Sequence, residues 1–134
     1  MISVFISQSQ VEKMYQEVAH YFQRDRLVNH RSTPEDELAL LVNGKANLWV
    51  AIQDGQICGA AIAQHRNYER APTYAVLTLG GDGGDWNELL KDLELFAAHT
   101  GCTHLDVLGR RGWLRRLDGF EESFTTISKR LNHV

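Results

Sequence analysis

The chain has 134 residues, of which 43% are hydrophobic and 23% are charged. These proportions are typical of a globular protein, and the length predicts one folded domain over residues 1–134. The formal net charge of −3 excludes strong nucleic-acid binding by the whole surface, although a local basic patch stays compatible with it. No apolar run is long enough to cross a membrane.

The cysteines and histidines predict no disulfide and no metal site. Cys58 and Cys102 are far apart in sequence and each has apolar neighbours, which favours reduced, buried thiols. Such thiols, and the absence of a secretory signal pattern in the first residues, predict a cytoplasmic protein. The 6 histidines show no spacing that is typical of metal ligands.

The first elements in chain order are a strand and a helix. Apolar and polar residues alternate over Ile2–Ser7, which predicts a half-buried strand. From Val11 to Phe22 the apolar residues recur at helical spacing, which predicts an amphipathic helix. Ser9 followed by Glu12 predicts a capping box at its start.

A second helix and a hairpin follow. Thr33 can cap a helix whose first residue is Pro34, and Gly44 is a typical stop. Asp54-Gly55 then separates two apolar runs, Asn47–Gln53 and Gln56–Gln64, which predicts a hairpin with a type I′ turn. The small residues Gly59, Ala60 and Ala61 predict that another group packs closely on the second strand.

The second half of the chain reads as a crossover unit. A strand over Thr73–Leu79 is followed by a glycine-rich run, a helix that begins near Trp86 and ends before Gly101, and a strand over Thr103–Leu108. A strand–helix–strand crossover implies that its two strands are parallel. The predicted fold class is therefore α/β, with a mixed, twisted sheet and helices on both faces.

The end of the chain predicts two further elements. A short basic helix or turn is expected over Gly109–Leu117, and Gly119-Phe120 interrupts the pattern. A final strand is expected over Glu122–Leu131.

This order of elements resembles the GNAT superfamily of N-acetyltransferases over nearly the whole chain. The resemblance depends on the Asp54-Gly55 hairpin, the strand–glycine loop–helix of residues 73–100 and the ending at Gly119-Phe120. The runs LTLGGDGGDW, AAHTGC and GRRGW more narrowly resemble the small GNAT-like proteins of tailed bacteriophages and prophages. For those, the resemblance implies a bacterial host cell or a virion as the location.

The glycine-rich run is the coenzyme A loop that the resemblance implies. The first turn of a helix has backbone N–H groups without a helical partner, and a glycine-rich loop before it lets a phosphate approach and bind them. Asp82 and Asp85 depart from the family's pattern, which has a basic residue, and they would repel a pyrophosphate. A plain turn with Asp85 as the helix cap, or a cation held by both carboxylates, are the alternatives. The expected acetyl-CoA-binding residues are Leu79, Gly80, Gly81, Gly83, Gly84, Asp85 and Trp86.

At the positions of the catalytic residues the sequence departs from the family's pattern. The family often places a tyrosine acid four residues before its terminal Gly-Phe, where this chain has Arg115. The resemblance implies a sheet that splays near the glycine loop, with a cleft between the strands over Thr73–Leu79 and Thr103–Leu108. Tyr74 is the candidate acid, on condition that it faces this cleft. The strand over Thr73–Leu79 contains no carboxylate base, and His65 and Glu69 are candidates that read better as surface residues.

A basic cluster follows the crossover. It consists of Arg110, Arg111, Arg115 and Arg116 around Trp113. Arginine forks and tryptophan suit a phosphate-bearing ligand such as coenzyme A or a nucleic acid, and they also suit a protein partner. A solvated helix face with Trp113 in the core is the structural alternative.

Two functions are therefore expected. The first is an acyl-CoA-dependent N-acyltransferase that uses acetyl-CoA and an unknown amine acceptor, with a degenerate coenzyme A loop. The second is a non-catalytic GNAT-fold phage structural or host-interaction protein that acts through the Arg110–Arg116 surface. The fold alone does not decide between them.

Overall fold

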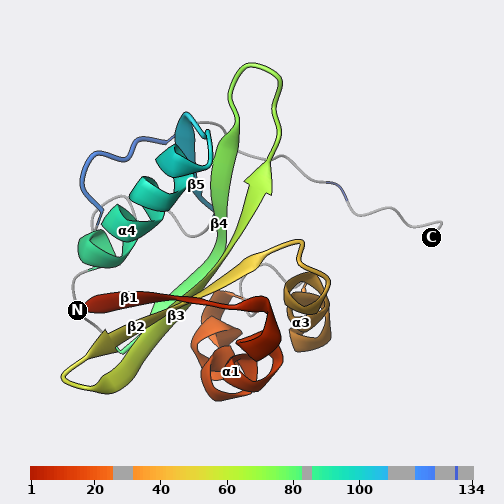
Figure 1. The fold of residues 1–134 in the computed structure, drawn as a ribbon, viewed down its shortest axis with the longest axis vertical. Coiled ribbons are helices and arrows are strands. Elements are labelled where there is room, and N and C mark those ends of the chain that lie inside the picture. The colour runs from red at the N-terminus through yellow and green to blue at the C-terminus, as the bar shows by residue number, and fades with distance from the viewer. Residues whose placement is uncertain (26–31, 83–85, 109–116, 123–128, 130–134) are drawn as a thin grey trace.

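The structure is a computed structural model of the chain, and it describes residues 1–25, 32–82, 86–108, 117–122 and 129. The helices and strands lie in the order that the sequence predicts (Figure 1). The strands are β1 (Ile2–Ile6), β2 (Asn47–Gln53), β3 (Gln56–Arg66), β4 (Thr73–Gly81) and β5 (His104–Val107). The helices are η1 (Gln8–Gln10), α1 (Val11–Val18), η2 (Ala19–Phe22), α3 (Pro34–Val42) and α4 (Trp86–His99), where η marks a 3₁₀ turn.

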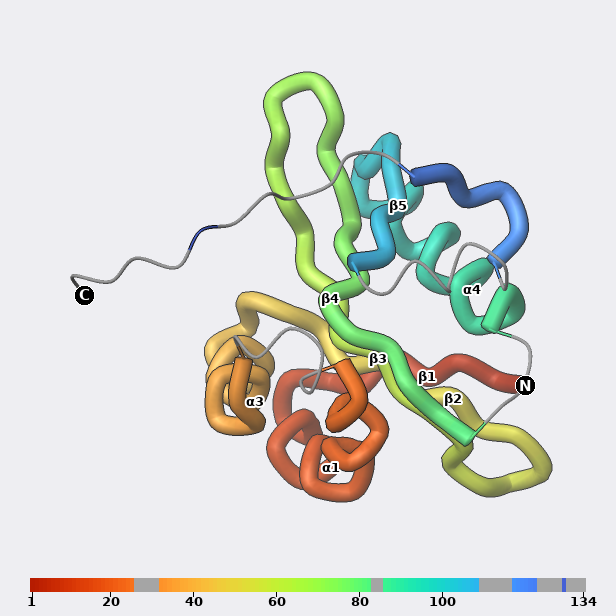
Figure 2. Tube along the Cα trace, turned by 180° about the vertical axis from the view of Figure 1, so that it is seen from behind, coloured from red at the N-terminus to blue at the C-terminus, as the bar shows by residue number. Residues whose placement is uncertain are grey.

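The five strands form one mixed sheet in the order β1-β2-β3-β4-β5. The first three pairings are antiparallel and the β4–β5 pairing is parallel, as the predicted crossover requires. Helices cover both faces: α1 and α3 lie on one face and α4 on the other (Figures 1 and 2). The predicted α/β fold class is confirmed.

Alternating side chains divide the core into two layers. Leu48, Val50 and Ile62 point to the layer that contains α1, η2 and α3. Trp49 and Tyr74 point to the layer under α4. A strand residue therefore belongs to one layer or the other by its parity, and this decides which side of the sheet each candidate site residue reaches.

The capping box predicted at Ser9 is wrong. Ser9 lies inside the 3₁₀ turn η1, and neither Ser7 before that turn nor Gln10 before α1 makes a side-chain cap bond. The chain enters the helix through a tight turn, so Ser9 is not at the position where its hydroxyl could reach a free helical N–H.

The start of α3 and the hairpin turn are confirmed. Thr33 and Asp36 form a reciprocal capping box, and Pro34 begins α3. Asp54 and Gly55 have φ angles of 53° and 76°, the two positive values that a type I′ turn requires.

Several predicted features lie outside the described residues. They are the glycine loop at 83–85, the basic helix or turn at 109–116, and most of the final strand at 123–128 and 130–134. None of the described helices has both the length and the apolar character to cross a membrane.

Candidate functional site

Strand β4 carries one extra residue where it pairs with β3. Thr78 pairs with Ile62 and Val76 pairs with Ala63, so Leu77 stands between the pairs as a bulge. A bulge lets two successive side chains reach the same face of a sheet. Leu77 and Thr78 accordingly both line a pocket on the α3 side.

Strands β4 and β5 part at this bulge. Their pairing covers residues 73–76 of β4, and the N–H of Leu108 donates to the carbonyl of Val76 at 2.9 Å. Beyond that point, no strand of the described residues pairs with the β5 side of residues 78–81. Within the described part of the chain, the last part of β4 is therefore a strand edge without a neighbouring strand, and we call it the open edge.

The N–H of Leu79 points to this open edge. The N–H of Asp82 donates to the carbonyl of Cys58 on β3 at 2.8 Å, so Asp82 faces β3. Backbone N–H groups alternate sides along an antiparallel strand, so the N–H of Gly80 also points to β3, while the N–H groups of Leu79 and Gly81 point away from it.

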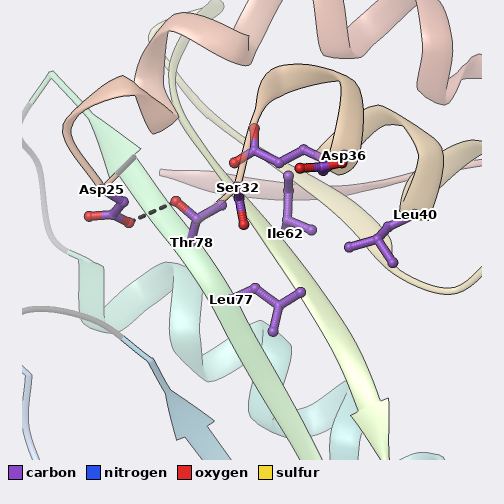
Figure 3. Close-up of a pocket in the computed structure, with 8 residues that line it drawn as sticks. Asp25, Ser32, Asp36, Leu40, Ile62, Leu77 and Thr78 are labelled. Atoms are coloured by element: carbon purple, nitrogen blue, oxygen red, sulfur yellow. Dashed lines mark hydrogen bonds between the residues drawn. The ribbon is translucent and has the colours of Figure 1, made fainter. Parts of the chain in front are cut away.

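Asp25 holds this edge with its carboxylate. Its Oδ2 accepts from the hydroxyl of Thr78 at 2.7 Å (Figure 3). The same oxygen accepts from the N–H of Leu79 at 3.2 Å. Asp25 is only 8% exposed, although it lies 53 positions before Thr78 in the chain. Asp25 is not predicted from the sequence, because no local pattern connects it with β4. The carboxylate that β4 itself lacks thus comes from the segment after η2.

A pocket of about 60 Å³ opens beside Asp25, between α3 and the face of β3 and β4 (Figure 3). It is lined by Asp25, Ser32, Asp36, Glu37, Leu40, Ile62, Leu77 and Thr78. The side chain of Asp36 accepts from the N–H of Thr33 at 3.0 Å, and Glu37 accepts from the hydroxyl of Tyr15 at 2.6 Å. Among the described lining residues three are acidic and none is basic, and a lining of this charge favours a cation.

Three of the expected acetyl-CoA-binding residues have packing roles. Gly80 faces η2 so closely that a Cβ there would lie 1.9 Å from the carbonyl oxygen of Tyr21. Gly81 faces the other way, and a Cβ there would lie 2.3 Å from the indole of Trp86. The same indole packs on Gly59, which is the close packing that the small residues of β3 predict. Gly80 and Gly81 thus belong to β4 and make room for neighbouring groups, and Trp86, the third of these residues, packs on the sheet.

The other loop residues stay predictions. Leu79 lies on β4 with its N–H at the open edge, as described above. Gly83, Gly84 and Asp85 lie outside the described residues, so neither the phosphate cradle nor the cap by Asp85 is tested.

Tyr21 meets Asp82 at the far end of β4. Its hydroxyl lies 3.1 Å from Oδ2 of Asp82 and 3.2 Å from the carbonyl of Ile57. Burial, followed by the neighbouring carboxylate of Asp82, raises the pKa of the Tyr21 hydroxyl. Tyr21 therefore keeps its proton at neutral pH. The sequence does not mark Tyr21 as a site residue, since it lies next to the apolar stripe of the first helix.

Tyr74, the candidate acid, lies in the layer under α4 and is 0% exposed. Its hydroxyl donates to Oδ1 of Asn47 at 2.7 Å and accepts from the indole N–H of Trp49 at 2.9 Å. Burial raises the pKa of Tyr74 above its ordinary value. This geometry favours a structural role, and a catalytic Tyr74 stays a prediction.

The remaining candidates lie away from the open edge or outside the described residues. His65 is exposed and its Nε2 lies 2.8 Å from the hydroxyl of Thr100 after α4, while Glu69 is exposed in the loop before β4. Both positions agree with the surface interpretation. Arg110, Arg111, Trp113, Arg115 and Arg116 lie outside the described residues.

Comparison with known proteins identifies this architecture. No family description matches the sequence, and no curated protein has a significantly similar sequence. The fold itself does match solved structures. One is an aminoglycoside acetyltransferase from an uncultured soil metagenomic sample, in complex with sisomicin. It has a TM-score of 0.69 at 16% identity, over 98% of this chain and 96% of that one.

Two further matches agree with it. A GNAT family acetyltransferase from Staphylococcus aureus has a TM-score of 0.67 at 16% identity, over 97% of this chain and 98% of that one. The aminoglycoside N-acetyltransferase AAC(6')-Iy in complex with CoA has a TM-score of 0.65 at 15% identity, over 98% and 94%. At these identities the likeness concerns the fold, and the chain has the fold of the GNAT acetyltransferases.

Proposed function

We propose that the protein is an acyl-CoA-dependent N-acyltransferase that transfers an acetyl group to an amine. The observation that supports it most directly is the parting of β4 and β5 at the Leu77 bulge, which leaves a strand edge open. An extended amide-containing chain such as a pantetheine arm can pair with a free strand edge. The comparison with a CoA complex of the same fold agrees with this use of the scaffold.

The pocket beside the edge supports an amine as the acceptor. In acyl transfer the amine nitrogen bonds to the acyl carbon, the carbon–sulfur bond breaks, and the amine proton is lost while the thiolate gains one. The acidic lining of the pocket, with Asp25 at the strand edge, attracts an ammonium group to that position. The acceptors of fold relatives, such as the aminoglycoside sisomicin, give a first set of amines to test.

The fit of acetyl-CoA to this edge has one conflict. The outward N–H of Leu79 is bound to the carboxylate of Asp25, and Asp82 adds a second negative charge at the end of β4. Both would weaken the binding of a polyanion. This observation favours the second candidate, a non-catalytic GNAT-fold protein of phage origin that binds a partner through residues 110–116.

Calorimetric titration with acetyl-CoA at moderate salt separates the two candidates. The enzyme proposal predicts a measurable heat and a rise in the thermal midpoint at millimolar ligand, followed by amine-dependent thiol release. Gly83→Asp adds a third carboxylate beside Asp82 and Asp85 and should abolish binding. Leu95→Asp adds the same charge at a position that is 62% exposed on α4, and it should bind as the wild type does. The absence of heat and of any thermal shift would contradict the proposal.

A further inference from the structure

The carboxylate of Asp25 occupies the backbone group that an acyl donor would need. Leu79 has the first N–H on β4 that faces the open edge beyond the ladder with β5, and that N–H already donates to Asp25 at 3.2 Å. One N–H cannot give a full hydrogen bond to two acceptors that approach from the same side. A ligand carbonyl and Asp25 are therefore mutually exclusive partners of Leu79.

Two further groups hold the hydrogen bond between Asp25 and Leu79 in place: the hydroxyl of Thr78 and the segment that precedes Asp25. The hydroxyl of Thr78 donates to the same oxygen of Asp25 at 2.7 Å, and this side chain is buried on the α3 side of β4. The segment before Asp25 is fixed as well, because the carbonyl of Tyr21 is packed against Gly80 and its hydroxyl is beside Asp82. The segment from Tyr21 to Asp25 thus lies along the open edge of β4, with Tyr21 near Gly80 and Asp82 and with Asp25 at Leu79.

We infer that Asp25 is an autoinhibitory residue: its carboxylate closes the open edge of β4 by holding the N–H of Leu79, and an acyl donor binds only when that carboxylate leaves. This inference rests on the proposed acyl-CoA site. It adds that the site is closed by the protein's own side chain, which must move toward the neighbouring pocket before a donor can pair with β4. The charge of the donor is not required for this competition.

The test uses S-acetylpantetheine, which carries no phosphate, beside acetyl-CoA. Asp25→Ala removes the competitor, and we expect it to bind S-acetylpantetheine at least about tenfold more tightly than the wild type, because hydrogen bonds to charged groups are the stronger class. Thr78→Val keeps the charge of Asp25 but removes one of its donors, so it should bind more tightly than the wild type as well. Asp25→Asn keeps an acceptor oxygen and should gain less than Asp25→Ala.

Asp36→Asn is the matched control. It removes a charge from the same pocket and leaves an oxygen to accept from the N–H of Thr33, without touching Leu79. If Asp36→Asn and Asp25→Ala strengthen acetyl-CoA binding equally and neither changes S-acetylpantetheine binding, the effect is one of charge and the inference is wrong.

Amide hydrogen exchange at Leu79 gives a readout without ligand. Asp25→Ala and Thr78→Val should both speed exchange at Leu79 more than at Gly80, whose N–H faces β3. Unchanged exchange at Leu79 in both variants overturns the inference, whatever the binding measurements give, because the exchange is measured without ligand. Wild-type binding that Asp25→Ala does not strengthen overturns the inference and leaves the proposed function intact. If the exchange responds but no variant binds either ligand, the proposed function fails and the autoinhibitory role fails with it.

Discussion

At the scale of single residues, the core contains a connected set of three polar side chains. The hydroxyl of Tyr74 joins the indole of Trp49 to the side-chain amide of Asn47, although the three residues come from two strands. A buried donor or acceptor that loses its partner has a larger energetic effect than the bond itself contributes. Tyr74 therefore has a stabilising role that does not depend on catalysis.

Replacement of Tyr74 by phenylalanine tests this role. Tyr74→Phe keeps the ring but leaves the indole N–H of Trp49 and the amide oxygen of Asn47 without this partner. We expect the free energy of unfolding at pH 7 to fall by about 1–3 kcal/mol. Urea denaturation measures it, with Tyr68→Phe as the control, because Tyr68 is 50% exposed. Equal stability of the two variants would contradict the structural role of the Tyr74 hydroxyl.

Asp25 shows why the candidate site could not be derived fully from the sequence. The glycine run, the absence of a carboxylate on Thr73–Leu79 and the candidate Tyr74 all come from local patterns. The approach of Asp25 to Thr78 depends on where the helical segments before it lie on the sheet, which is a tertiary property. The sequence also left undecided which face of the sheet the side chain of Tyr74 points to, because its strand is apolar on both faces.

At the scale of elements, the end of β4 depends on close packing rather than on a free glycine loop. Gly59 and Gly81 are paired across β3 and β4, and the indole of Trp86 lies over both. Gly80 faces the opposite side, against the backbone of η2. The two faces should therefore respond differently to an added methyl group.

Alanine substitutions separate these two contacts. Gly80→Ala places a methyl group against a backbone carbonyl, and Gly59→Ala places one 2.5 Å from the ring of Trp86. Each should lower the free energy of unfolding by about 1–3 kcal/mol, as overpacking does. Trp86→Phe removes the ring atoms that Gly59→Ala would meet, so the double variant should be more stable than additivity predicts. The same background should give no such gain for Gly80→Ala, and a gain of equal size there would refute the assignment of faces.

At the scale of the whole molecule, the order of elements was predictable because its signals are local. The Thr33–Pro34 start of α3 and the Asp54-Gly55 turn carry their conformational reasons in two or three residues. The bulge at Leu77 and the short β4–β5 ladder are set by pairing between distant strands, and no residue pattern marks them. The parting of these two strands near the glycine loop was expected from the resemblance, but the bulge at which they part was not predicted.

The ionisation of buried tyrosine links the core to the stability of the whole chain. Burial raises the pKa of Tyr74, so the unfolded chain, with a tyrosine pKa of about 10, loses this proton first as the pH rises. Stability is therefore fully present below pH 10 and falls above it, by up to about 1.4 kcal/mol for each pH unit from this one group. Denaturant titrations between pH 8 and about pH 11 measure the slope. Tyr74→Phe should have a shallower alkaline slope than both the wild type and Tyr68→Phe. If all three lose stability in parallel, the pKa of Tyr74 does not differ between the folded and the unfolded chain, and the hydroxyl is not buried as the structure has it.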